Sequence, residues 1–188
     1  MTVPGRSISD HPLLETRRDV LRHYLGDLVY GANDGIITTF AIVAGVAGAD
    51  LPGAVVIILG VANLIADGFS MGASNFLSLR SKATMERIHV GRVSEPFALR
   101  HGLATFLAFV TIGVIPLLGY ILPFRGDPFV VASVMTLSAM FVVGASRSFV
   151  SGGRWWSEGA EMLAVGATAA AVAFGLGRLV AALTGYAP

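Results

Sequence analysis

Apolar residues occur along this chain in five long runs that short polar segments separate. The runs cover residues 28–49, 52–77, 97–122, 128–150 and 158–183. Each run reaches the length of about 20 residues that a helix needs to cross the hydrocarbon core of a bilayer. Only Asp50 and Leu51 separate the first two runs, which predicts a tight antiparallel helical hairpin. The pattern therefore predicts an all-α integral membrane protein with five transmembrane helices.

Composition supports a membrane protein and excludes several other classes. Of the 188 residues, 54% are hydrophobic and 13% are charged, which is too little charge for a soluble domain of this size. No basic tract is typical of nucleic-acid binding, and the absence of cysteine excludes disulfides and thiolate metal sites. We expect an N-terminal arm over residues 1–27 with a short amphipathic helix, a transmembrane domain over 28–184 and a tail over 185–188.

The distribution of positive charge predicts the orientation. All of the 13 Lys and Arg residues except Arg125 and Arg178 lie in the N-terminal arm or near the connectors after the second and fourth runs. Because cytoplasmic segments carry an excess of Lys and Arg, we expect a cytoplasmic N-terminus and a C-terminus on the outside.

Two carboxylates interrupt the apolar runs, Asp34 in the first and Asp67 in the second. An aspartate near the centre of a spanning helix costs about 2.5–3.5 kcal/mol on insertion scales. In the second run, the polar residues recur at helical spacing and form one stripe, which consists of Asn63, Asp67, Ser70, Met71, Ser74, Asn75 and Ser78. Serine and asparagine alone are typical of helix packing, whereas intramembrane carboxylates are typical of ion and proton paths. We therefore expect a path that the first two helices line.

The donors in these two runs favour a transition metal as the ion. Asp34 and Asp67 offer carboxylate oxygens, Asn63 and Asn75 offer amide oxygens, and Met71 offers a thioether. This mixed set suits Fe²⁺ or Mn²⁺ better than Mg²⁺ or Ca²⁺. Methionine also commonly fills packing gaps, and for Met71 this alternative stays open. Carboxylates in a low-dielectric site hold protons and release them when a divalent cation binds, which would allow metal/proton exchange.

These stretches resemble the vacuolar iron transporter, or CCC1-like, family of membrane proteins. The resemblance rests on GANDGIITTFAIVAGVAGA, LIADGFSMGASNFLSLRSK and ALRHGLATFLAFVTIGVIPLLGY, and on Glu161-Met162-Leu163 in the last run. It implies a homodimer without a prosthetic group, which exports Fe²⁺, often with Mn²⁺, from the cytosol in exchange for protons. By this resemblance Asp34 and Met71 match the transport aspartate and methionine of the family. We expect the bacterial inner membrane as the location.

The sequence departs from this family at the end of the second run. Where the family usually has Gly-Glu-Tyr, this chain has Ser74-Asn75-Phe76, so an amide replaces a carboxylate of the path. We hypothesise that Asp67 restores the lost charge at a different depth. The connector over residues 81–96 is also too short for the glutamate-rich cytosolic domain that some members insert there.

Three glutamates are candidates for gathering metal at the cytoplasmic mouth. By the resemblance, Glu161 matches a glutamate near this mouth, and Glu158 lies one turn before it. Glu86 lies in the connector after the second run. A solvated charge remains the alternative for Glu86, and an acidic residue in the first turn of a helix remains the alternative for Glu158.

Two other functions compete with transport. A scaffold or regulatory membrane protein could share this fold, since the missing glutamate could mark a branch that has lost transport. An intramembrane aspartyl protease also needs two aspartates on facing helices, but neither Asp34 nor Asp67 lies in a Gly-x-Gly-Asp setting.

Overall fold

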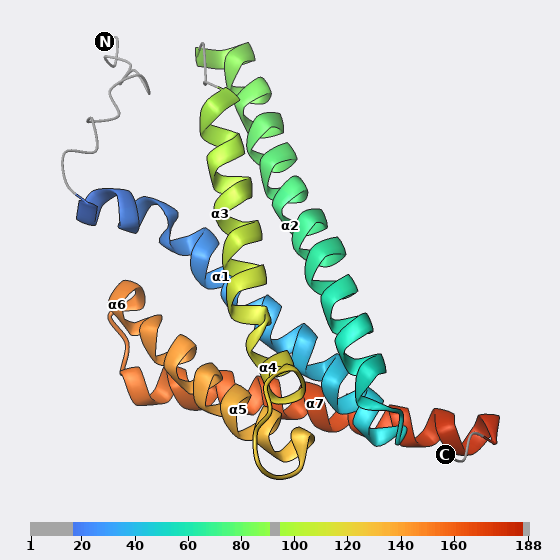
Figure 1. The fold of residues 1–188 in the computed structure, drawn as a ribbon. Helices are drawn as coiled ribbons and strands as arrows, with labels where there is room; N and C mark the ends of the chain where they lie inside the picture. The colour runs from blue at the N-terminus through green and yellow to red at the C-terminus, as the bar shows by residue number, and fades with distance from the viewer. Residues whose placement is uncertain (1–16, 91–94, 186–188) are drawn as a thin grey trace.

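The computed structural model describes residues 17–90 and 95–185, and helices account for nearly all of them (Figure 1). The helices are α1 (Arg17–Gly48), α2 (Gly53–Val90), α3 (Glu95–Gly113), α4 (Ile115–Ile121), α5 (Pro128–Ser146), α6 (Ser148–Ser151) and α7 (Trp155–Thr184). Five segments are long and apolar enough to cross a membrane: Tyr24–Gly48, Gly53–Lys82, Ala98–Ile121, Pro128–Ser146 and Trp155–Thr184. The expected all-α fold with five spanning helices is confirmed for this part of the chain.

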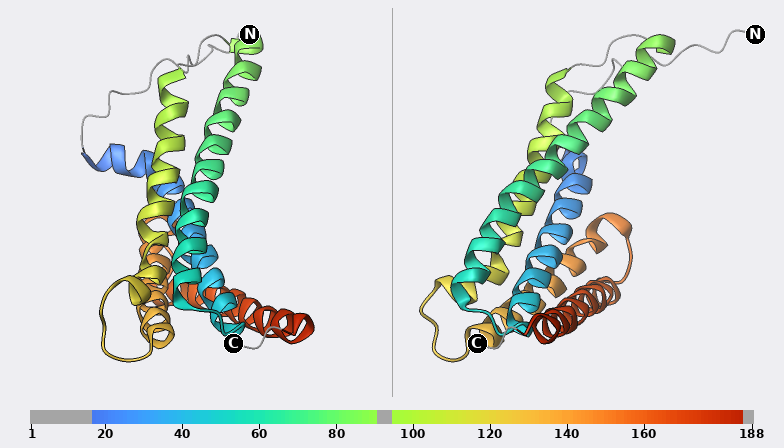
Figure 2. Two further views of the ribbon diagram at one scale, coloured as in Figure 1. Left: turned by 45° about the vertical axis from the view of Figure 1, so that its right-hand side comes forward. Right: turned by 90° about the vertical axis from the view of Figure 1, so that its right-hand side faces the viewer.

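Helix α1 lies at the centre of the packing. It contacts α2, α3, α5 and α7, while α2 packs along α3 and α5 packs along α7 (Figures 1 and 2). The side chains of Ile36, Val43 and Phe40 on α1 are buried. A polar residue on α1 therefore lies close to several other helices.

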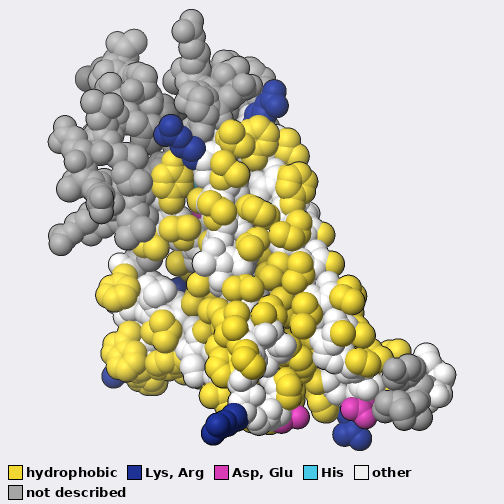
Figure 3. Space-filling model, in the orientation of Figure 1, with side chains coloured by type: hydrophobic (Ala, Val, Ile, Leu, Met, Phe, Trp, Pro, Cys, Tyr) yellow, Lys and Arg dark blue, Asp and Glu magenta, His cyan; other side chains and the backbone are white. Residues whose placement is uncertain are grey.

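The outer surface is largely apolar, as lipid contact requires. Figure 3 shows hydrophobic side chains over most of the visible face, with most visible charged side chains near its two ends. Leu and Val residues of α7 such as Leu176, Val180 and Leu183 are more than half exposed. This distribution fits a protein that crosses a bilayer.

The connection between α1 and α2 is the tight hairpin that the sequence predicts. Asp50 adopts a left-handed conformation with φ of 55°, which Asp tolerates better than most residues. The amide nitrogen of Leu51 donates to the carbonyl oxygen of Val46 at 3.1 Å and closes the turn. From this turn α2 runs back toward the other end of α1, and α3 packs against both helices.

The other spans differ in detail from the five predicted runs. The third run is divided into α3 and α4 near Val114, because Pro116 has no N–H to donate within the helix. The fourth run ends at Ser146, and α7 begins at Trp155 rather than at residue 158. The first span is continuous with the arm from Arg17 onward, whereas residues 1–16 of the expected arm lie outside the described residues.

Glycines allow α1 and α2 to approach α3 closely. A Cβ atom added to Gly31 or Gly35 would lie 2.4 Å from a backbone carbonyl oxygen of α3, that of Thr105 or Phe109. On α2, a Cβ on Gly72 would lie 2.7 Å from the carbonyl oxygen of Gly102 in α3. These G-x-x-x-G glycines therefore form contacts within one chain.

Candidate functional site

Asp34 on α1 and Asp67 on α2 are two carboxylates that the tight turn brings near each other. Both side chains are half-buried, and they lie close enough for the two carboxylates to interact electrostatically. The tight turn brings them to the same depth, because each is about equally far along the chain from it. Two carboxylates at one depth are an arrangement that a divalent cation or shared protons can stabilise.

The polar stripe of α2 is divided between two environments. Asn63, Asp67, Met71 and Asn75 are half-buried, whereas the three serines of the stripe are exposed: Ser70, Ser74 and Ser78. The side chain of Met71 packs against the buried apolar core, as a gap-filling methionine does. The amide nitrogen of Asn63 is buried and has no hydrogen-bond partner among the described residues. The half-buried members thus line the interior side of α2.

Asn75 belongs to a hydrogen-bonded network that joins α1, α2 and α3. Its Nδ2 atom donates to Asp27 Oδ1 and to Thr105 Oγ1, each at 2.8 Å. The other carboxylate oxygen of Asp27 forms a short hydrogen bond with Nδ1 of His101. The hydroxyl of Thr105 donates in turn to the carbonyl oxygen of His101 at 3.0 Å. The network places a carboxylate from α1 beside the amide of Asn75.

Sequence reasoning missed Asp27 and His101. Asp27 precedes Asp34 by seven positions, so both lie on one face of α1, about 10 Å apart along the helix axis. This spacing was the signal that could have found Asp27. His101 is buried, with 7% of its surface exposed, and its ring lies 4.6 Å from that of Tyr24. No periodic pattern in its own helix marks it.

The predicted cytoplasmic mouth contains a cation as well as carboxylates. Arg147, at the end of α5, lies 3.9 Å from Glu158 and 3.9 Å from Glu161, on the first turns of α7. The hydroxyl of Ser151 in α6 forms a short hydrogen bond with Oε1 of Glu158. The side chain of Glu86 lies outside the described part of the chain.

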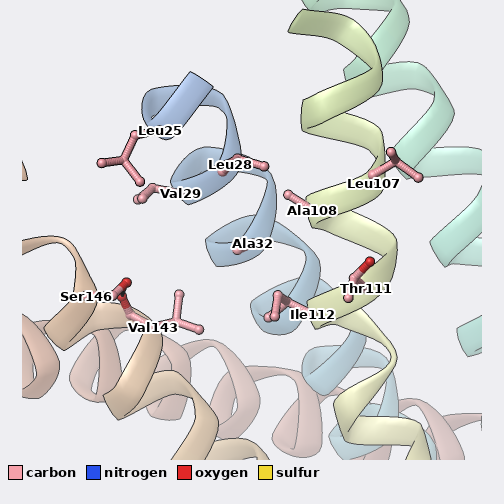
Figure 4. Close-up of a pocket in the computed structure, with 10 residues that line it drawn as sticks. All are labelled: Leu25, Leu28, Val29, Ala32, Leu107, Ala108, Thr111, Ile112, Val143 and Ser146. Atoms are coloured by element: carbon pink, nitrogen blue, oxygen red, sulfur yellow. Dashed lines mark hydrogen bonds between the residues drawn. The ribbon is translucent and has the colours of Figure 1, made fainter. Parts of the chain in front are cut away.

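Two cavities adjoin the N-terminal half of the α1 span. One, of about 390 Å³, lies between α1, α3 and α5 and is mostly apolar (Figure 4); it is lined by Leu25, Leu28, Val29, Ala32, Leu107, Ala108, Thr111, Ile112, Val143 and Ser146. The other, of about 410 Å³, is more polar and is lined by Leu25, Gly26, Val29, Tyr30, Asn33, Arg147 and Ser151. Neither of these two cavities includes Asp34 or Asp67.

The side chains near Asp34 and Asp67 that could bind a metal are of different chemical types. Among the residues whose side chains the structure describes, no group of three His, Asp or Glu side chains comes together at one point. A metal at Asp34 and Asp67 would therefore have to draw further ligands from amide or thioether groups, or from a second chain.

Comparison with known proteins identifies the family. A model of the VIT family matches residues 25–98 and 85–178, which together make up most of the chain. The chain belongs to the VIT family. A protein named vacuolar iron transporter from Toxoplasma gondii is 26% identical over 238 residues, covering 91% of this chain and 79% of the relative. Vacuolar iron transporter 1 of Arabidopsis thaliana is 24% identical over 212 residues, covering 82% of this chain and 85% of the relative.

A third relative is more similar in sequence, but over a shorter stretch of the chain. The vacuolar iron transporter of Plasmodium berghei is 49% identical over 57 residues, which cover 30% of this chain and 21% of that protein. These VIT relatives are named as transporters, which supports metal transport and agrees with the expectation that the chain is not an enzyme. The expected resemblance is thereby confirmed.

Proposed function

We propose that this VIT-family chain exports Fe²⁺ from the cytosol in exchange for protons, with Mn²⁺ as a second substrate. The observation that carries the proposal is the pair Asp34 and Asp67, two half-buried carboxylates within electrostatic range of each other on the candidate spanning helices α1 and α2. Membership of the VIT family and the names of the relatives support iron as the ion. Both carboxylates would bind metal in one state and protons in the other.

Further ligands would come from the interior side of α2. Asn63 is half-buried on the same side of α2 as Asp67, one turn away, and its amide oxygen would complete the coordination. Met71, about one turn from Asp67, would add a soft thioether that favours Fe²⁺ over Mg²⁺. Asn75 would act in the path through its amide oxygen, since its nitrogen already donates to Asp27 and Thr105.

A second copy of the chain would cover the exposed face of α2. The surface of α2 is largely exposed in the single chain, including Ser70, Ser74 and Ser78. Hydroxyl groups facing hydrocarbon gain by packing against another helix, so a second copy in a homodimer would cover them.

Orientation and location follow from the charge distribution. By the positive-inside rule, the N-terminus would be cytoplasmic, and Glu158 and Glu161 would face the cytosol with Glu86. Their carboxylates would raise the local metal concentration at the mouth of the path. The relatives are named as vacuolar proteins, so the bacterial inner membrane stays a prediction from the sequence.

Metal flux into proteoliposomes tests the proposal. Vesicles that contain a metal-sensitive dye would receive Fe²⁺, Mn²⁺ or Mg²⁺ from outside. We expect uptake of Fe²⁺ and Mn²⁺ above that of protein-free vesicles, little uptake of Mg²⁺, and loss of uptake in Asp34→Asn. Absence of uptake in correctly folded wild-type protein would contradict transport and favour a scaffold role. Cleavage of a membrane-embedded peptide would instead support the protease alternative.

A further inference from the structure

Arg147 occupies the space between the two glutamates of the proposed cytoplasmic mouth. Its Nε atom lies 3.9 Å from Oε2 of Glu158, and its Nη1 atom lies 3.9 Å from Oε2 of Glu161. The two carboxylates lie three residues apart on the first turns of α7, so they share one face of the helix. One guanidinium therefore interacts with both carboxylates that would receive a metal ion.

A hydrogen bond holds one carboxylate oxygen of Glu158, whereas the other oxygen has no hydrogen-bond partner among the described residues. Oε1 accepts a hydrogen bond from Ser151, and the hydroxyl of Ser151 in turn accepts one from the backbone nitrogen of Gly153 at 3.0 Å. Oε2 is buried and has no hydrogen-bond partner among the residues that the structure describes. At 3.9 Å, Arg147 gives this oxygen electrostatic compensation without a hydrogen bond. A divalent ion would bind such an oxygen more strongly than the guanidinium does.

A cavity adjoins the Arg147 side chain next to the two glutamates. Arg147 also lines the cavity of about 410 Å³ that Tyr30 and Asn33 of α1 border. The Oδ1 atom of Asn33 is buried and has no hydrogen-bond partner within the described ranges. This oxygen belongs to a residue that lines the same cavity as Arg147, and it is an acceptor of the kind to which a guanidinium donates. Asn33 directly precedes Asp34, so this cavity adjoins the proposed path.

We propose that Arg147 is a displaceable internal cation, which occupies the metal-receiving position between Glu158 and Glu161 until a divalent cation replaces it. The inference rests on the proposed function, because it gives those two glutamates the role of receiving metal. With Arg147 in place, the three side chains carry a net charge of −1, whereas both carboxylate charges are available to a metal once Arg147 has left. Arg147 thereby sets the metal concentration at which the mouth fills.

The test measures metal binding rather than transport. Mn²⁺ is added to detergent-solubilised full-length protein, and the EPR signal of unbound Mn²⁺ gives the dissociation constant. We expect Arg147→Gln to bind Mn²⁺ about fivefold more tightly than wild type, the factor that one ion pair of this kind is worth. Arg147→Lys keeps the charge and should stay close to wild type. A melting curve of each variant shows that the fold is retained.

Arg154→Gln is the matched control. It removes the same charge from the same loop, where Arg154 lies over the ring of Trp156 at 5.0 Å. An equal gain in affinity in Arg154→Gln would show a general effect of net charge and overturn the inference. When Glu158 and Glu161 are both replaced by Gln, adding Arg147→Gln should leave the Mn²⁺ affinity unchanged, because the two carboxylates for which Arg147 and the metal compete are no longer present. A gain that persists in this background would also overturn it.

The two proposals fail in different ways. Unchanged Mn²⁺ affinity in Arg147→Gln, in a protein whose wild type transports metal, would refute the displaceable cation and leave the proposed function intact. No transport by wild type, together with the expected gain in Mn²⁺ affinity, would keep Arg147 as a competitor for metal and refute the exporter.

Discussion

Substitution of Gly35 by alanine tests the packing that positions Asp34. A Cβ atom at Gly35 would lie 2.4 Å from the carbonyl oxygen of Phe109 and 3.0 Å from its Cα atom. These atoms belong to the backbone of α3, so they cannot move aside as a flexible side chain would. For ordinary van der Waals contact, α1 and α3 would have to separate by roughly 1 Å. The carboxylate of the adjacent Asp34 would move with α1.

The expected loss can be worked from two opposing effects. Overpacking of this kind costs about 1–3 kcal/mol, whereas alanine gains up to about 1 kcal/mol over glycine in a helix. With the full alanine gain the net loss is up to about 2 kcal/mol, which would lower the melting temperature by about 2–4 °C for each kcal/mol in a chain of this size. The assay is thermal unfolding of the detergent-solubilised protein, followed by metal flux of the same variant at a temperature where it is folded.

Gly175→Ala provides the control for this prediction. A Cβ at Gly175, in α7, would have no heavy atom within 4 Å, so this substitution should be neutral or slightly stabilising. If Gly35→Ala melts at the same temperature as Gly175→Ala, or higher, the close contact of α1 with α3 is not as the structure places it. The reasoning about the position of Asp34 would then fail as well.

The remaining predictions concern the carboxylates and the thioether. Asp34→Asn and Asp67→Asn should each abolish Fe²⁺ uptake into proteoliposomes while melting near the wild-type temperature, whereas Asp50→Asn in the hairpin turn should keep it; uptake by either of the first two would remove that residue from the path. Asp27→Leu should destabilise the detergent-solubilised protein by about 1–4 kcal/mol in urea unfolding, because two side-chain hydrogen bonds of about 0.6–2 kcal/mol each are lost; an unchanged midpoint would show that the network contributes nothing. Met71→Leu should lower the ratio of Fe²⁺ to Mg²⁺ uptake without preventing folding, and an unchanged ratio would assign Met71 to packing alone.

The helical hairpin shows what could be predicted from the sequence. A connector of two residues between two spanning runs requires an antiparallel hairpin, which brings Asp34 and Asp67 to a similar depth. Periodicity predicted one polar stripe on α2, because a helix places residues three and four apart on one face; four of its seven members are half-buried in the structure, and the three serines are exposed. Connector length and helical periodicity can therefore predict how helices that are neighbours in the sequence are arranged.

Contacts between distant segments could not be predicted in the same way. Asp27 and His101 are separated by most of two spans, and only the crossing of α1 and α3 brings them together. Arg147 reaches the glutamates of α7 because α6 and the left-handed Gly152, with φ of 70°, turn the chain back. Neither contact follows from helix periodicity, so both required the three-dimensional arrangement.

Metal-driven proton movement is the measurement that tests the central claim most directly. Proteoliposomes containing a pH-sensitive dye would receive Fe²⁺, with wild type compared to Asp34→Asn and Asp67→Asn. The account predicts proton movement opposite to the metal in wild type, and its loss in both variants. Fe²⁺ uptake without any pH change in wild type would contradict exchange through the paired carboxylates.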